Sequence, residues 1–240
     1  MPIYNQQDNL IPLTHKIREA IYQRIHSYEI IYIDDGSTDG SSVLLDQLAQ
    51  EYKEVKVYHL KNSPGQTAAF ATGFRKAAGR LVATIDADLQ DDPSDILNLI
   101  PLTNKYDLVC GVRVNCRKGF GFIKMIMSLI LDKVRYRFSN EAVDTGFTLK
   151  LFKSEVVKSL YLELIEILYL FKGMDRYFPS LAKMNGYRVT HAPINFCPQS
   201  KISEFFIGNR MQKRLKTLYP LAGCNVHNSH FVKLPKDNII

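Results

Sequence analysis

Residues 80–93 read RLVATIDADLQDDP, and this stretch decides the fold because an apolar run ends abruptly in four acidic side chains. The apolar part is typical of a buried strand, in which Asp is disfavoured. Asp86 and Asp88 lie two residues apart where the chain leaves the strand, so both carboxylates can turn toward one cation. The cluster therefore predicts either a metal-binding strand end or a solvated turn.

Oxygen ligands decide which cation the cluster suits. Gln90 adds a neutral oxygen to the two carboxylates, and such ligands favour Mg²⁺ or Mn²⁺, which keep several waters and bind substrate phosphates. The sequence argues against an EF-hand, because no Gly stands at the sixth loop position and no Glu at the twelfth. The alternative is that Asp91, Asp92 and Pro93 simply begin the next helix. The spacing alone leaves both interpretations open.

Strand and helix patterns alternate through the first 112 residues. Strands are predicted at 29–33, 55–60, 80–86 and 107–112, with helices between them, and Asp8 or Asn9 is expected to cap the first helix. This order predicts an α/β fold with a mostly parallel sheet flanked by helices. Ligands bind beyond the carboxyl ends of such strands. The clusters DDGSTD and DADLQDD and the side chain of Arg113 follow three of these ends.

The second half is less regular. Residues 119–138 predict a basic amphipathic helix, 144–152 become strand-like, 154–185 are mostly helical, and 187–195 alternate as a strand does. We expect one domain over residues 1–218 and a poorly ordered tail over 219–240.

Composition narrows the classes of partner. Lys and Arg number 31 against 24 Asp and Glu, a net charge of +7, which favours anionic partners such as phosphates, nucleic acid or a membrane surface. The four cysteines form no CxxC pair and no signal peptide precedes them, so reduced thiols in the cytoplasm are expected. No run reaches the roughly 18 apolar residues of a membrane span.

Two further loops could bind a ligand. DDGSTDGS is either a turn or a place where Asp34 and Asp35 accept hydrogen bonds from a base or ribose. NSPGQTAAFATGF resembles a loop leading into a helix whose N-terminus could receive an anion. The chain has neither GxGxxG nor GKS/T, which argues against dinucleotide-binding and P-loop proteins.

Eight motifs stand in order along residues 2–214: PIYNQQDNL, IDDGSTDGS, NSPGQTAAFATGF, TIDADLQDDP, GVRVN, DTGFTLKLF, FKGMDRYFPSLAKMNGYRVTHAPIN and IGNR. The series resembles family-2 glycosyltransferases of the GT-A fold, a Rossmann-like arrangement. It looks most like the bacterial polyprenyl-phosphate glycosyltransferases related to dolichol-phosphate mannose synthase. The resemblance implies transfer of a sugar, with inversion, from a nucleotide diphosphate (UDP favoured) to a polyprenyl phosphate.

The resemblance also implies roles for individual residues. Asp86, Asp88 and Gln90 would hold Mg²⁺ or Mn²⁺, and Asp144 and Asp88 would be catalytic, with Asp144 orienting the acceptor more than deprotonating it. The donor would meet Pro2, Tyr4, Asn5, Asp35, Gly65, Gln66, Asp86, Ala87, Arg113 and Arg210.

The implied partners are the nucleotide sugar and the lipid phosphate, not nucleic acid. The expected location is the cytoplasm, with peripheral contact at the inner face of the cell membrane, and homo-oligomers are possible. Two departures support an alternative, a truncated relative that binds nucleotide or partners without transfer: the first strand is reduced to Met1–Tyr4, and Glu204 stands where the family carries positive charge. A soluble saccharide acceptor is a further alternative.

Overall fold

The protein is seen in a computed structural model that describes residues 1–22, 24–113, 149–167, 177–195 and 231–232. Strands and helices alternate in the first half as the sequence predicts. They are β1 (Pro2–Ile3), α1 (Gln7–Ile21), β2 (Ile30–Asp34), α2 (Ser41–Glu51), β3 (Val55–Leu60), α3 (Gln66–Lys76), β4 (Leu81–Thr84), α4 (Asp95–Leu99), the 3-10 helix η1 (Ile100–Asn104) and β5 (Leu108–Arg113). The second half contributes β6 (Lys150–Lys153), α6 (Ser154–Ile167), α7 (Phe178–Met184), β7 (Val189–Ile194) and β8 (Phe231–Val232).

The described strands form two sheets. The first has the order β1-β2-β3-β8 with all neighbours parallel, and the second has the order β4-β6-β5-β7. Strand β6 is antiparallel to both β4 and β5, whereas β5 and β7 are parallel. The mostly parallel sheet predicted from the sequence is confirmed, but the antiparallel insertion of β6 was not predicted.

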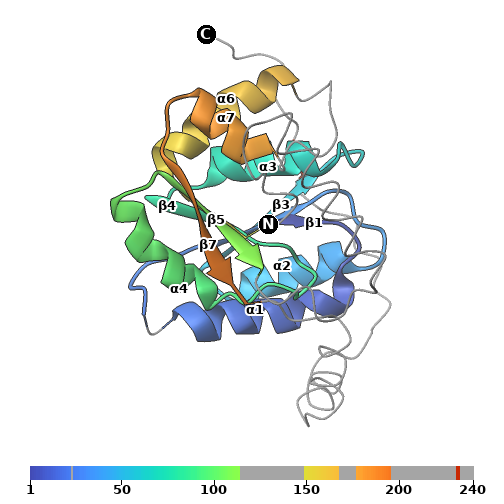
Figure 1. The fold of residues 1–240 in the computed structure, drawn as a ribbon. Helices are drawn as coiled ribbons and strands as arrows, with labels where there is room; N and C mark the ends of the chain where they lie inside the picture. The colour runs from blue at the N-terminus through green and yellow to red at the C-terminus, as the bar shows by residue number, and fades with distance from the viewer. Residues whose placement is uncertain (23, 114–148, 168–176, 196–230, 233–240) are drawn as a thin grey trace, which may run out of the picture.

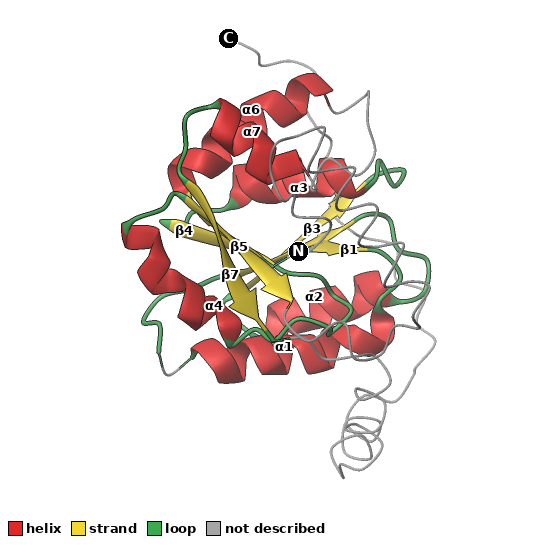
Figure 2. Ribbon diagram, in the orientation of Figure 1, coloured by secondary structure: helices red, strands yellow, loops and turns green. Residues whose placement is uncertain are grey.

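The strands make a middle layer between two layers of helices (Figures 1 and 2). Helices α1, α2 and α4 cover one face, and α3, α6 and α7 cover the other. Under the first face, Leu10 and Leu13 of α1 are fully buried with Tyr32 of β2. Under the second, Phe74 of α3 packs edge-on against Phe152 of β6 at 5.6 Å between ring centroids. Burial of these apolar faces holds the layers together.

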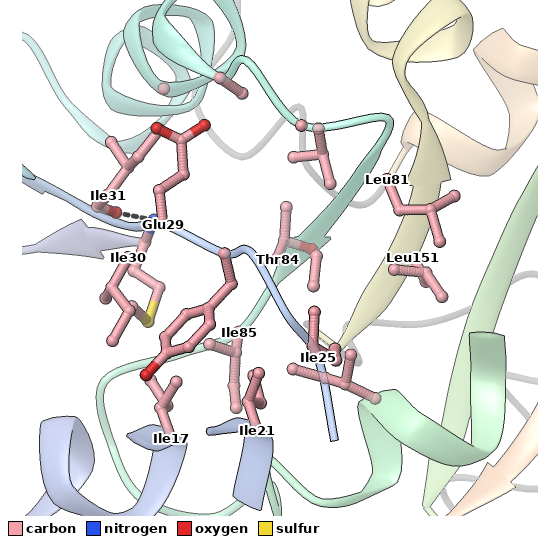
Figure 3. Close-up of a pocket in the computed structure, with 18 of the residues that line it drawn as sticks. Ile17, Ile21, Ile25, Glu29, Ile30, Ile31, Leu81, Thr84, Ile85 and Leu151 are labelled. Carbon is pink, nitrogen blue, oxygen red and sulfur yellow. Dashed lines mark hydrogen bonds between the residues drawn. The ribbon is translucent and has the colours of Figure 1, made fainter. Parts of the chain in front are cut away.

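A mostly apolar cleft of about 750 Å³ separates the two sheets between β2 and β4. Ile30 and Ile31 line one side of it, Leu81 and Thr84 line the other, and Ile17 of α1 closes one end (Figure 3). Strand β1 pairs with β2 only at Pro2 and Ile3, and the described neighbour of β4 is β6.

The first helix begins differently from the prediction. It starts at Gln7, Gln6 occupies the N-cap position without a side-chain cap, and Asp8 lies inside the first turn. The backbone N–H of Gln6 instead donates to Ser41 Oγ at 2.9 Å, and that of Gln7 donates to Asp39 Oδ2 at 3.2 Å. The side chains of Asp39, in the loop before α2, and of Ser41, the first residue of α2, thus satisfy the helix start, so no local cap is needed.

Several predicted features lie outside the described residues. These are the amphipathic segment 119–138, the whole DTGF motif, Glu204, the IGNR motif and most of the tail. Within the tail, Phe231–Val232 form β8, parallel to β3. The domain boundary at residue 218 stays a prediction.

Candidate functional site

The loop after β2 is organised by Asp34, which is almost fully buried. Its carboxylate accepts hydrogen bonds from Ser37 N at 3.0 Å, from Ser42 Oγ at 2.5 Å and from His59 Nδ1 at 2.8 Å. Burial alone would raise the pKa of Asp34, but these hydrogen bonds outweigh it and lower the pKa to about 2. Asp34 therefore holds the loop in place, and both of its oxygens already have protein partners.

Asp35 joins two of the loops that the sequence assigned to the donor. Its carboxylate accepts a hydrogen bond from Gly65 N at 3.0 Å and from Ser63 Oγ at 3.3 Å. Burial raises the pKa of this carboxyl group above its ordinary value. Gln66 is the first residue of α3, directly after Gly65. The fold thus brings Asp35, Gly65 and Gln66 together at the carboxyl ends of β2 and β3.

The end of β1 meets the same loop. Asn5 takes a positive φ of 51°, its N–H donates to Ser37 Oγ at 3.0 Å, and its Oδ1 accepts from Thr38 N at 2.8 Å. Tyr4 is 51% exposed beside it, and Pro2 lies in β1 opposite Ile33. Asn5 therefore shapes the loop, and Tyr4 leaves an aromatic ring at the surface next to it.

The residues after β4 alternate in burial. Ala87 and Leu89 are buried, whereas Asp86 and Asp88 are partly exposed, so the two acids are accessible at the strand end. Leu89 has a φ of 62°, an uncommon value for a bulky residue and one that clusters at functional loops. Burial lowers the pKa of the Met1 amino group to about 5, and Asp86 opposes that shift. Asp86 therefore lies near the start of β1.

Arg113 is held at the end of β5 by the same acidic loop. Its Nε donates to Asp91 Oδ1 at 2.8 Å, and its Nη1 donates to Gln90 Oε1 at 3.0 Å. The side chain of Asp91 is fully buried and that of Arg113 is 12% exposed. Gln90 N in turn donates to Asp88 Oδ1 at 3.0 Å. This network connects the acids after β4 to a fixed guanidinium group.

The interpretation of Asp91 as part of a helix start is wrong. Helix α4 begins four residues later, at Asp95. Asp92 does contribute to the helix start, because its Oδ1 accepts the N–H of Ser94, the N-cap residue of α4, at 2.9 Å. Asp91 points elsewhere because Arg113 offers a buried cation that its carboxylate can neutralise.

The strand end fits a hard divalent cation. Asp86 and Asp88 supply carboxylate oxygens at an accessible position, and Mg²⁺ and Mn²⁺ complete such sites with waters and phosphates. Gln90 is less suited than the sequence suggested, since its Oε1 already accepts a hydrogen bond from Arg113. Over the described ranges, no group of three or more His, Cys, Asp or Glu side chains is arranged to hold a metal.

Two predicted site residues, Asp144 and Arg210, lie outside the described residues. Two residues of the site were not assigned to it from the sequence. His59 ends a strand pattern next to the NSPGQ loop, and that position was the available signal. For Asp91 the signal was its place in an acid cluster shortly before a lone Arg at the next strand end.

The family model described as "Glycosyl transferase family 2" matches residues 1–160. The chain belongs to glycosyl transferase family 2. The family predicted from the ordered motifs is thereby confirmed, and the matched part contains the ends of β1 to β5.

Curated proteins resemble this chain over two thirds of its length. "Dodecaprenyl-phosphate galacturonate synthase" of Rhizobium johnstonii is 32% identical over 166 residues, which cover 68% of this chain and 49% of that protein. "Undecaprenyl-phosphate 4-deoxy-4-formamido-L-arabinose transferase" of Aeromonas hydrophila is 35% identical over 162 residues, or 67% and 49%. This chain spans about half the length of the curated relatives it matches.

Solved structures resemble the fold. A mannosyltransferase of Pyrobaculum calidifontis, in complex with GDP-Man and Mn²⁺, has a TM-score of 0.54 at 20% identity and covers 82% of this chain and 55% of its own. Glucosyl-3-phosphoglycerate synthase of Mycobacterium tuberculosis has a TM-score of 0.52 at 13% identity, with 84% and 72% covered. These likenesses confirm the predicted GT-A fold.

None of the helices in the described part of the chain is long and apolar enough to span a membrane.

Proposed function

We propose that this domain transfers a sugar from a nucleotide diphosphate donor, most naturally UDP-linked, to a polyprenyl phosphate, inverting the anomeric centre. The observation that carries the proposal is the pair Asp86 and Asp88 just after β4, with Asp88 linked to Arg113 through Gln90, in a chain of glycosyl transferase family 2. The names of the curated relatives support a polyprenyl-phosphate acceptor.

The donor is proposed to lie across the carboxyl ends of β1 to β4. Asp35, Gly65 and the exposed ring of Tyr4 would meet the nucleoside, and Pro2, Asn5 and Gln66 would shape that pocket. Asp86 and Asp88 would hold Mg²⁺ or Mn²⁺ on the diphosphate, with Ala87 between them. The cation, when bound, neutralises the charge that develops on the leaving diphosphate.

Arg113 is proposed to add a fixed positive charge near the same phosphates. Asp91 and Gln90 orient its guanidinium group, so little rotamer freedom is left to lose when an anion binds. Arg210 is proposed to do the same from the second half of the chain.

Asp144 is proposed to orient the acceptor. A phosphate acceptor has a second pKa of about 6 and is mostly dianionic at neutral pH. It therefore needs no general base to deprotonate it. The acceptor's lipid would sit at the membrane, and the net charge of +7 supports peripheral contact with anionic lipids.

The test is a titration with UDP and with GDP, each with and without Mn²⁺, followed by transfer to a short polyprenyl phosphate. We expect UDP to bind more tightly in the presence of Mn²⁺ than in its absence. Asp88→Asn removes one metal ligand, so we expect it to weaken UDP binding in the presence of Mn²⁺ by at least about tenfold. Asp92→Asn is the matched control, because Asp92 is exposed and its Oδ1 accepts only a local N–H among the contacts described.

The outcomes separate the alternatives. Metal-dependent binding without transfer would favour a relative that binds nucleotide only, and transfer to a soluble saccharide alone would change the acceptor. Absence of metal-dependent binding in the wild-type protein would contradict the assignment of Asp86 and Asp88.

A further inference from the structure

His59 lies at the end of β3, and neither the sequence motifs nor the proposed chemistry uses it. His59 is buried, with 7% of its surface exposed. The ring bridges two carboxylates from different elements: Nδ1 lies 2.8 Å from Asp34 Oδ2 in β2, and Nε2 lies 3.0 Å from Asp46 Oδ1 in α2. Both ring nitrogens can donate at once only when the imidazole is protonated.

We infer that His59 is a positioning residue for the nucleotide: as an imidazolium it ties β3 to Asp34 and Asp46 and so holds the loop that carries Asp35. The inference rests on the proposed function, because Asp35 is assigned there to the nucleoside.

The loop in question, residues 35–40, connects β2 to α2. Asp34 anchors its beginning and Asp46 belongs to the helix that follows it, so the two carboxylates bound by His59 stand on either side of the loop. Ser42 reinforces the same closure by donating to the Asp34 oxygen that faces His59. The loop itself contacts Asn5 through Ser37 and Thr38. Movement of α2 away from β3 would therefore displace the loop 35–40 and, with it, Asp35 at the donor site.

Loss of the proton from His59 opens one side of this bridge. Neutral imidazole keeps a single N–H. Asp34 is buried and stays bonded, whereas the side chain of Asp46 is 50% exposed and can turn to water. Over the described residues, the charged groups that face the ring are Asp34 from β2 and Asp46 from α2. Phe231 of β8 is its backbone partner and does not titrate.

The direction of the pH effect follows from these contacts. The hydrogen bond to Asp34, opposed by burial and aided by Asp46, raises the pKa of His59 above its ordinary value. A raised pKa means that the bridge is complete below the ordinary range of histidine and is lost as pH rises through the folded-state pKa. Nucleotide binding should therefore weaken as the solution becomes more alkaline.

The experiment measures UDP affinity between about pH 6 and 9, the range that brackets histidine titration, together with the NMR titration of the His59 ring. The wild-type affinity is expected to fall about threefold to tenfold across the His59 transition, as one charge-assisted hydrogen bond is lost. His59→Asn can still donate to Asp34 but does not titrate, so it is expected to remove this fall. His59→Asn also serves as the control for ionisation of UDP itself, because that ionisation affects binding to both proteins equally.

Asp46→Asn is the second variant, because the side chain of Asp46 is half-exposed on α2 and its replacement should leave folding intact. It should lower the pKa of His59 and shift the affinity change to lower pH. Equal pH profiles in wild type and His59→Asn, or a His59 pKa at or below its ordinary value, would overturn the inference and leave the proposed function standing. No UDP binding at any pH would instead contradict the proposed function, a distinguishable result.

Discussion

Arg113 and Asp91 show how one ion pair can organise a site. The carboxylate of Asp91 is fully buried, and the guanidinium of Arg113 spans from it to Gln90. A buried charge is tolerated only when a partner neutralises it. The pair thus fixes the loop after β4 against the end of β5, and Asp88 is joined to that loop through Gln90 N.

Asp91→Ala is expected to lower the free energy of unfolding by about 3 kcal/mol, because it leaves Arg113 without its buried counter-charge. Urea denaturation measures the change. Asp92→Ala, at the exposed neighbouring position, should cost less than about 1 kcal/mol. The same substitution is then made in a protein that already carries Arg113→Ala. If Asp91→Ala lowers the free energy of unfolding there by no more than Asp92→Ala does, the ion pair is confirmed as the cause. Equal losses from both single variants would contradict the prediction.

Among the elements, the turn between β3 and α3 depends on backbone conformation. Gly65 has φ +99° and ψ 168°, a region that residues with a Cβ rarely enter. This conformation points its N–H at Asp35 Oδ1 and leads directly into α3. Asn62 and Ser63 also have positive φ values, so the whole turn is conformationally demanding.

Gly65→Ala is expected to destabilise the protein by about 1–3 kcal/mol through backbone strain alone. An added Cβ would meet no described atom within 4 Å, so a steric clash does not contribute. Gly73→Ala is the control: Gly73 lies within α3, its Cβ would sit 3.6 Å from Ile33 Cγ1, and helix propensity predicts a gain of up to about 1 kcal/mol. Thermal or urea unfolding of both variants tests the difference, and losses of equal size would refute it.

At the scale of the molecule, the chief feature is the cleft between the sheets. Its walls are mostly apolar side chains of β2, β4, α1 and α3, and its volume is about 750 Å³. Ala83 of β4 is partly buried and lines it. An apolar cavity of this kind tends to accept hydrophobic ligands in preference to water.

We expect the native protein to enhance the fluorescence of the apolar probe ANS while its unfolding stays cooperative. Ala83→Phe should fill part of the cleft, remove most of the enhancement and raise the free energy of unfolding by about 0.5–2 kcal/mol. Val43→Phe, at a position 58% exposed on α2, is the matched control and should do neither. Unchanged probe fluorescence in Ala83→Phe would place the probe elsewhere.

Much of the fold was predictable because its signals are local. The apolar runs of β2, β3, β4 and β5 are short, β-branched and separated by helical patterns, which suffices to predict parallel strands with ligands at their carboxyl ends. The start of α1 was not predictable, since Asp39 and Ser41, which lie more than 30 residues further along the chain around the start of α2, satisfy its first N–H groups. Strand β6 was predicted as a strand, but its antiparallel place between β4 and β5 depends on pairing that local sequence does not encode.

By itself the sequence determined the order of elements, the family and the position of Asp86 and Asp88 at a strand end, because periodicity and motif spacing are properties of neighbouring residues. Only the tertiary structure decided that Asp91 binds Arg113, that Gln90 faces the same guanidinium, and that His59 bridges Asp34 and Asp46. The physical reason is burial: a carboxylate removed from water must find a donor, and the nearest donor is supplied by the packing of strands that lie far apart along the chain.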